Sequence, residues 1–181
     1  MIFEPLRLKG AYLIRMEPIQ DNRGWFARTF CQREFEEQGL ESGIVQTSVS
    51  NNTKKGTLRG MHWQASPYEE VKMIRCTRGR IFDVLVDIRK DSDTFGQWEG
   101  FELYPDDPCL LYVPKGFAHG FQTMEDNTDT RYWMAEFYHP EVSMGFRWND
   151  PEVGIQWPQV SERIISEKDK ELPCLRELQL S

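Results

Sequence analysis

The sequence predicts an all-β protein built as a jelly roll of two sheets. Short segments rich in apolar, aromatic and β-branched residues recur along the chain, and Gly, Pro, Asp and Asn turns separate them. Helical signals are few and lie toward the two ends of the chain. Many short strands with this punctuation are typical of a double-sheet jelly roll at this length. The expected strands are residues 11–16, 43–50, 72–77, 81–88, 101–104, 109–113 and 130–138.

Local signals place the individual elements. The strands 72–77 and 81–88 are expected to pair through the turn Arg78-Gly79-Arg80. Thr29 can cap a short helix that runs through Glu37, and Gly39 suits the end of that helix. A second short helix is expected near residues 161–165. Further turns are expected at 21–24, 105–108, 114–116 and 126–127.

Length and charge exclude several classes of protein. The chain has 181 residues, which predicts one domain over residues 1–181, and its net charge is −7. A general nucleic-acid binder would carry a basic face, so this balance argues against one. No apolar run approaches the roughly 20 residues of a membrane helix. Four cysteines without a CxxC spacing predict reduced thiols in a cytoplasmic protein.

The residues that could carry chemistry point to acid–base catalysis. The chain has only three histidines, and none stands two positions from another, so a metal site is disfavoured. No nucleophile elbow, dinucleotide fingerprint or P-loop is present. The densest segment is LRGMHWQ, where Arg59 suits a phosphate oxygen and His62 suits proton transfer.

Each candidate also has a structural interpretation that spacing alone leaves open. His62 could be a satisfied core or surface histidine, and Arg23 could be a solvated turn charge. Tyr132 and Tyr138 are an even number of residues apart, so both could point inward from one strand. The same two rings could equally serve only sheet packing.

Seven segments in order carry a family resemblance over nearly the whole chain. They are DNRGWFARTF (21–30), LRGMHWQ (58–64), VKMIRCTRGRIFDVLVDIRKDSDTFGQW (71–98), PKGFAHGF (114–121), RYWMAEFYHPE (131–141), WNDPEVGIQWP (148–158) and SEKD (166–169). With them the chain resembles the dTDP-4-dehydrorhamnose 3,5-epimerase family. The resemblance implies a cupin-type double-stranded β-helix with short flanking helices. It also implies a homodimer, no metal, no cofactor and a nucleotide-sugar substrate.

The resemblance assigns roles by position. His62 would be the base, Asp169 its partner, Tyr132 the proton donor and Lys72 the cation near the enolate oxygen, and Lys72 would also favour the phenolate of Tyr132. Such an enzyme inverts C3 and C5 of a 4-keto-6-deoxy sugar, because the ketone makes both C–H groups acidic. The positions that match substrate-binding residues are Arg23, Phe26, Arg28, Gln46, Ser48, Arg59, His119, Tyr138, Ser143 and Lys168.

Departures from the family pattern keep alternatives open. Arg28, Ser48 and Ser143 stand where Glu, Asn and Glu are usual, and Glu70 replaces a common Gln. A mono-epimerase, or an epimerase for another nucleotide sugar, therefore remains an alternative. A sugar ketoisomerase, a binding module without turnover and a metal-dependent cupin dioxygenase are the other candidate classes.

Overall fold

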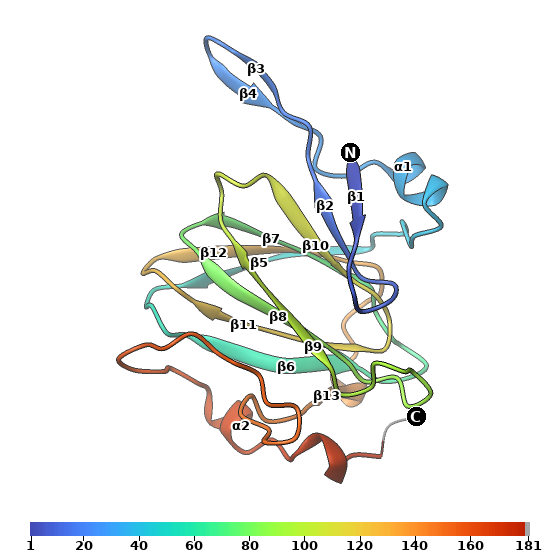
Figure 1. The fold of residues 1–181 in the computed structure, drawn as a ribbon, viewed down its shortest axis with the longest axis vertical. Coiled ribbons are helices and arrows are strands. Elements are labelled where there is room, and N and C mark those ends of the chain that lie inside the picture. Colours follow the sequence, from blue (N-terminus) through green and yellow to red (C-terminus); the bar gives the residue numbers. More distant parts are fainter. Residues whose placement is uncertain (180–181) are drawn as a thin grey trace.

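Two antiparallel sheets face each other in the computed structural model, which describes residues 1–179 (Figure 1). One sheet has six strands in the spatial order β1 (Ile2–Pro5), β2 (Tyr12–Arg15), β10 (Cys109–Val113), β7 (Lys72–Arg78), β12 (Thr128–Met134) and β5 (Gln46–Asn52). The other has five in the order β13 (Ser143–Gly145), β6 (Leu58–Gln64), β11 (Phe117–Thr123), β8 (Ile81–Asp87) and β9 (Trp98–Leu103). The predicted jelly-roll class is confirmed.

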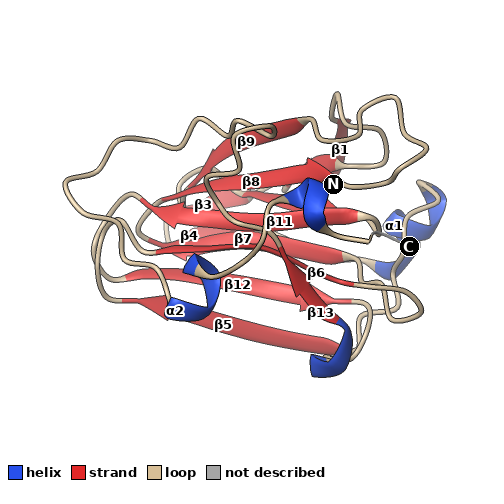
Figure 2. Cartoon of the chain, turned by 90° about the horizontal axis from the view of Figure 1, so that it is seen from below, coloured by secondary structure: helices blue, strands red, loops and turns tan. Residues whose placement is uncertain are grey.

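The remaining elements are short and peripheral. Strands β3 (Ile19–Asp21) and β4 (Gly24–Phe26) form a separate hairpin that projects from the body at the top of Figure 1. Helices α1 (Gln32–Glu37) and α2 (Glu167–Lys170) lie outside the two sheets, as the blue segments of Figure 2 show. Two 3-10 turns occupy Pro140–Val142 and Leu175–Glu177.

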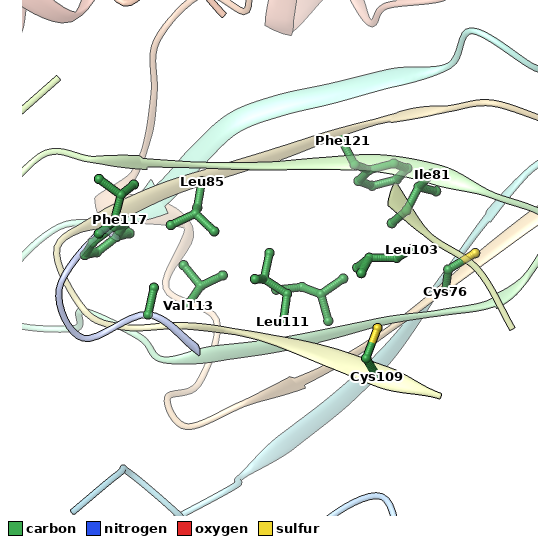
Figure 3. Close-up of a cluster of buried hydrophobic side chains, with 12 residues drawn as sticks. Cys76, Ile81, Leu85, Leu103, Cys109, Leu111, Val113, Phe117 and Phe121 are labelled. Carbon is green, nitrogen blue, oxygen red and sulfur yellow. The ribbon is translucent and has the colours of Figure 1, made fainter. Parts of the chain in front are cut away.

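One apolar cluster lies between the sheets. Leu111 and Ile74 from the six-stranded sheet meet Leu85, Ile81 and Phe121 from the five-stranded sheet, and all five are buried (Figure 3). Burying such side chains contributes about 1.5–3 kcal/mol each relative to exposure. This cluster occupies only part of the interior, and the polar cavity described below occupies another part.

Parts of the outer faces of both sheets are also covered. Phe35 of α1 packs on the six-stranded sheet with Ile14, Met73 and Leu110. The C-terminal segment packs on the five-stranded sheet through side chains that include Trp157. Strands β8 and β10 are therefore buried on both faces, which explains why they read as continuous apolar runs in the sequence.

Two predictions about elements are wrong. Strands β7 and β8 do not pair, because the chain crosses from one sheet to the other at Arg78–Arg80 and each strand pairs within its own sheet. The second helix is α2 at Glu167–Lys170, where the Ser166 hydroxyl accepts a hydrogen bond from the Asp169 backbone N–H as an N-cap. The predicted position, 161–165, instead contributes an isolated bridge through Ile164.

The other helix begins later than expected. Helix α1 follows Cys31 rather than Thr29, and no side chain caps its first turn. Its C-terminal end agrees with the prediction, because Gly39 has a φ of +69° just after the C-cap.

Candidate active site

A cavity of about 380 Å³ opens between the two sheets. Its walls carry half of the site residues singled out from the sequence. The lining residues are Ser50, Arg59, His62, Lys72, His119, Phe121, Tyr132, Ser166, Lys168 and Asp169. The structure thus brings together the four predicted catalytic residues and three of the predicted binding residues.

A bulge in β6 turns Arg59 and His62 to the same side. On a regular strand two residues three apart face opposite ways. Here Arg59 pairs with Phe121 and His62 with His119, so three steps on β6 oppose two on β11. This extra residue resets the alternation, which is a known effect of β-bulges. Both side chains can therefore line one cavity.

Glycines make the bulge possible. Gly60 has a φ of +129°, and a Cβ on it would lie 2.6 Å from the Gly120 Cα. Gly60 lets two strands approach each other, and the cavity forms beside their contact.

His62 is held by a buried carboxylate. Its Nε2 lies 2.7 Å from Asp169 Oδ1, and the Gly60 backbone N–H points at the other oxygen from 3.4 Å. Burial alone would raise the pKa of Asp169, but the His62 hydrogen bond and charge lower it below its ordinary value. A carboxylate that stays ionised fixes the tautomer with the proton on Nε2 and leaves Nδ1 for another partner.

Tyr132 reaches the cavity from the opposite sheet. Its ring packs against the interior apolar cluster and stands 6.1 Å from the His119 ring. Burial raises the pKa of its hydroxyl above the ordinary value, the Asp83 carboxylate raises it further, and Arg59 opposes the shift. Lys72 is not among the groups that shift this pKa, so its help to the phenolate stays a prediction. The phenol keeps its proton at neutral pH.

His119 has a carboxylate partner of its own. Its Nε2 lies 2.9 and 3.0 Å from the two oxygens of Asp83, and both side chains are buried. Burial raises the pKa of Asp83, which the imidazole opposes. Sequence reasoning did not single out Asp83, because an aspartate inside an apolar strand carries no spacing signal.

Lys72 forms an ion pair at the cavity wall. Its Nζ lies 2.7 Å from Glu70 Oε1, and both side chains are largely buried. Glu70 is one of the departures noted in the sequence, so this ion pair follows from that departure.

Seven predicted binding residues do not line this cavity. Arg23 and Phe26 lie on the projecting hairpin, where Arg23 pairs with Asp21, and Arg28 pairs with Glu34 at 2.8 Å. Ser143 begins β13, and Ser48 is exposed on β5. Gln46 accepts a hydrogen bond from the Tyr138 backbone N–H at 2.6 Å.

Tyr138 does not point inward with Tyr132. Strand β12 ends at Met134, so the even spacing no longer sets the side-chain direction, and Tyr138 is 61% exposed. Conversely, three lining residues were missed. Ser50 lies two residues after Ser48 on β5, so period-two spacing places both on the same face of the strand and could have indicated Ser50. Phe121 and Ser166 lie inside the segments that carry the family resemblance.

Two kinds of feature are absent from residues 1–179. No group of three His, Cys, Asp or Glu side chains there is arranged to hold a metal ion. No helix in the same residues has the length and apolar character needed to cross a membrane.

Comparisons with known proteins agree on one family. A family model described as dTDP-4-dehydrorhamnose 3,5-epimerase matches residues 5–177. A dTDP-4-dehydrorhamnose 3,5-epimerase from Methanothermobacter thermautotrophicus is 44% identical over 94% of this chain and 92% of its own length.

Two solved structures of sugar epimerases share this fold. A dTDP-6-deoxy-D-glucose-3,5-epimerase from Legionella pneumophila, in complex with dTDP-4-keto-L-rhamnose, has a TM-score of 0.93, with 34% identity over 98% of this chain and 94% of that one. A 3'-monoepimerase from Streptomyces bikiniensis, in complex with dTDP-quinovose, has a TM-score of 0.90, with 29% identity over 96% and 87%.

By its fold and its relatives, the protein is an isomerase with a cupin-type β-fold. Within that class the chain belongs to the dTDP-4-dehydrorhamnose 3,5-epimerase family.

Proposed function

We propose that this enzyme inverts C3 and C5 of dTDP-4-dehydro-6-deoxy-D-glucose and forms dTDP-4-dehydro-L-rhamnose. One observation carries the proposal. The His62–Asp169 pair and the neutral phenol of Tyr132 line one cavity from opposite sheets. Inversion at carbon needs a base on one face of the sugar ring and a proton donor on the other.

The reaction follows from these positions. His62 Nδ1 takes a proton from the carbon beside the ketone, and the electron pair moves onto the ketone oxygen as an enolate. Lys72 stabilises that oxygen, and Asp169 stabilises the imidazolium. Tyr132 then gives its proton to the opposite face of the carbon, which inverts it. Exchange with solvent restores both groups before the second carbon reacts, and no metal or cofactor takes part.

Arg59, His119 and Lys168 are the cavity residues that we assign to substrate binding. Arg59 and Lys168 carry positive charge for a diphosphate, although the whole chain is negative. We also assign Arg23, Phe26, Arg28, Gln46, Ser48, Tyr138 and Ser143 to the nucleotide side of the site. Because several of these lie away from the cavity, the assignment requires help from a second chain.

We therefore propose a homodimer of a single-domain chain, residues 1–181, in which the β3–β4 hairpin reaches the partner. Ile19 and Phe26 are cross-strand neighbours on this hairpin and are 74% and 75% exposed. A two-stranded hairpin is marginally stable alone, and a paired apolar surface of this kind favours burial against another chain. We place the enzyme in the cytoplasm, where its four free cysteines would stay reduced.

Proton NMR in deuterated buffer tests the activity. The substrate is dTDP-4-dehydro-6-deoxy-D-glucose, with a reductase added afterwards to trap the product. Loss of both the C3 and C5 signals with an L-rhamnose product supports the proposal. Loss at one carbon makes the enzyme a mono-epimerase. No exchange, with other nucleotide sugars also inert, leaves a binding module.

Two variants assign the roles in the same assay. His62→Ala is expected to lower the rate of exchange at both carbons by about 10²–10⁴-fold. Tyr132→Phe is expected to retain exchange while product formation falls by at least about 100-fold. Near-normal turnover in His62→Ala, or equal loss of exchange and product in Tyr132→Phe, would contradict the assigned roles.

A further inference from the structure

We propose that Asn52 is a positioning residue that fixes the guanidinium of Arg59 for an anionic ligand. The inference rests on the proposed role of Arg59 in substrate binding. Asn52 ends β5 in the six-stranded sheet, and Arg59 lies on β6 in the other sheet. Arg59 Nε donates a hydrogen bond to Asn52 Oδ1 at 2.9 Å, so one amide joins the two sheets beside the cavity.

The amide of Asn52 cannot turn away from Arg59 without cost. Asn52 is buried, and its Nδ2 donates to the Ser50 and Thr128 carbonyl oxygens, both at 3.3 Å. A rotation of the amide would place its oxygen against two carbonyl oxygens and break both bonds. These two bonds therefore hold Oδ1 toward Arg59.

The contact leaves the binding edge of Arg59 available. Nε is engaged by Asn52, while no hydrogen bond or ion pair within residues 1–179 engages either terminal nitrogen. A guanidinium binds phosphate through two parallel N–H donors, which requires a defined plane. Asn52 supplies that plane and removes rotational freedom that a ligand would otherwise have to restrict.

A neutral partner suits an anion site better than a carboxylate would. An ion-paired arginine presents less net positive charge to a ligand. Asn52 accepts the Nε–H without neutralising the guanidinium, which keeps its full charge beside the cavity. The ligand class that fits this arrangement is a phosphate or diphosphate group.

A double-mutant cycle tests the proposal without turnover. The probes are dTDP and inorganic pyrophosphate, and the measurement is affinity by titration calorimetry. Asn52→Ala is expected to weaken dTDP binding about tenfold in the native background and less than twofold beside Arg59→Ala. With the dTDP-sugar substrate, the same change should raise KM about tenfold while kcat changes less than threefold.

Asn51→Ala is the matched control. Asn51 is adjacent on β5, is exposed, and bonds Asp129 on the outer face. This variant should bind dTDP as the native protein does. If Asn52→Ala does not fold, Asn52→Asp takes its place in the same double-mutant cycle.

A ligand-free measurement separates this proposal from the proposed function. The Arg59 Nε–H should exchange with solvent slowly in the native protein and in Asn51→Ala, and at least tenfold faster in Asn52→Ala. Equal binding losses with and without Arg59, or fast Nε–H exchange in the native protein, would overturn the positioning role. Failure of turnover with slow exchange would instead count against the proposed reaction alone.

Discussion

Two histidines line the cavity, and the Nε2 of each is hydrogen-bonded to an aspartate. The two aspartates differ in how strongly their surroundings favour the ionised carboxylate. Asp169 also receives the Gly60 N–H, and its pKa is lowered. Among residues 1–179 Asp83 receives only His119, and burial raises its pKa. An ionised carboxylate stabilises the imidazolium that forms when a histidine takes a proton. His62 is therefore better equipped as the base than His119.

Replacing Asp169 tests this difference. Asp169→Asn keeps the size of the side chain but removes the charge and allows the wrong tautomer of His62. We expect kcat to fall by about 100-fold or more, measured as reductase-coupled product formation. The melting temperature serves as the control for folding. A folded variant with kcat within threefold of the native value would contradict the assignment.

At the scale of elements, the bulged pairing of β6 with β11 decides whether Arg59 and His62 share a cavity. A Cβ on Gly120 would lie 2.7 Å from Met61 Sδ and 2.8 Å from the Arg59 carbonyl oxygen. Gly120→Ala must therefore push the bulge outward.

We expect Gly120→Ala to destabilise the protein by about 1–3 kcal/mol in urea unfolding and to lower kcat/KM at least tenfold. Gly43→Ala is the control, since its Cβ would meet only the flexible Glu41 carboxylate at 3.1 Å. Native stability and activity in Gly120→Ala would show that the contact between β6 and β11 at Gly120 is not tightly packed.

The loop after β8 depends on one buried carboxylate. Asp87 accepts hydrogen bonds from Arg89, Ser92 and Thr94. Burial alone would raise its pKa, but these bonds lower it to about 2 from 3.8. A carboxyl whose pKa is lower in the folded state stabilises the fold at pH values above its pKa in the unfolded state. That stabilisation is lost as the pH falls through the pKa of the folded state.

Asp87→Asn should therefore lower the free energy of unfolding by about 2 kcal/mol at pH 7. The difference from the native protein should shrink between about pH 4 and pH 2, measured by urea unfolding at several pH values. Asp21→Asn, an exposed aspartate paired with Arg23, should show little effect. A difference that stays constant with pH would contradict the ionic origin.

Sequence patterns predicted an element correctly where a single local pattern determines it. The apolar run Cys109–Val113 coincides with β10, because a strand buried on both faces needs no alternation. Pairing between β7 and β8 was mispredicted, since a turn signal does not say whether the next strand joins the same sheet. Tyr138 was misplaced because period-two spacing holds only while the strand continues. The alignment of Arg59 with His62 depends on a bulge that no local pattern reveals.

For the molecule as a whole, the β3–β4 hairpin is the element that projects from the body (Figure 1). Its turn carries Arg23, and the hairpin lies at the opposite end of the view from α2, whose residues line the cavity (Figure 1). Within one chain, no residue of the hairpin lines that cavity. In the proposed homodimer it would bury Ile19 and Phe26 and bring Arg23 to the partner's site.

Phe26→Asp tests this arrangement. Placing a charge at a buried apolar contact costs several kcal/mol, so we expect a native dimer and a variant that is largely monomeric at micromolar concentration, by sedimentation velocity. The variant should keep the fold, because Phe26 is 75% exposed in one chain, and should bind dTDP at least tenfold more weakly if Arg23 acts across the interface. Phe95→Asp, at another exposed aromatic, is the control and should remain dimeric. A monomeric native protein, or a Phe26→Asp dimer with native affinity, would show that the hairpin contacts no second chain.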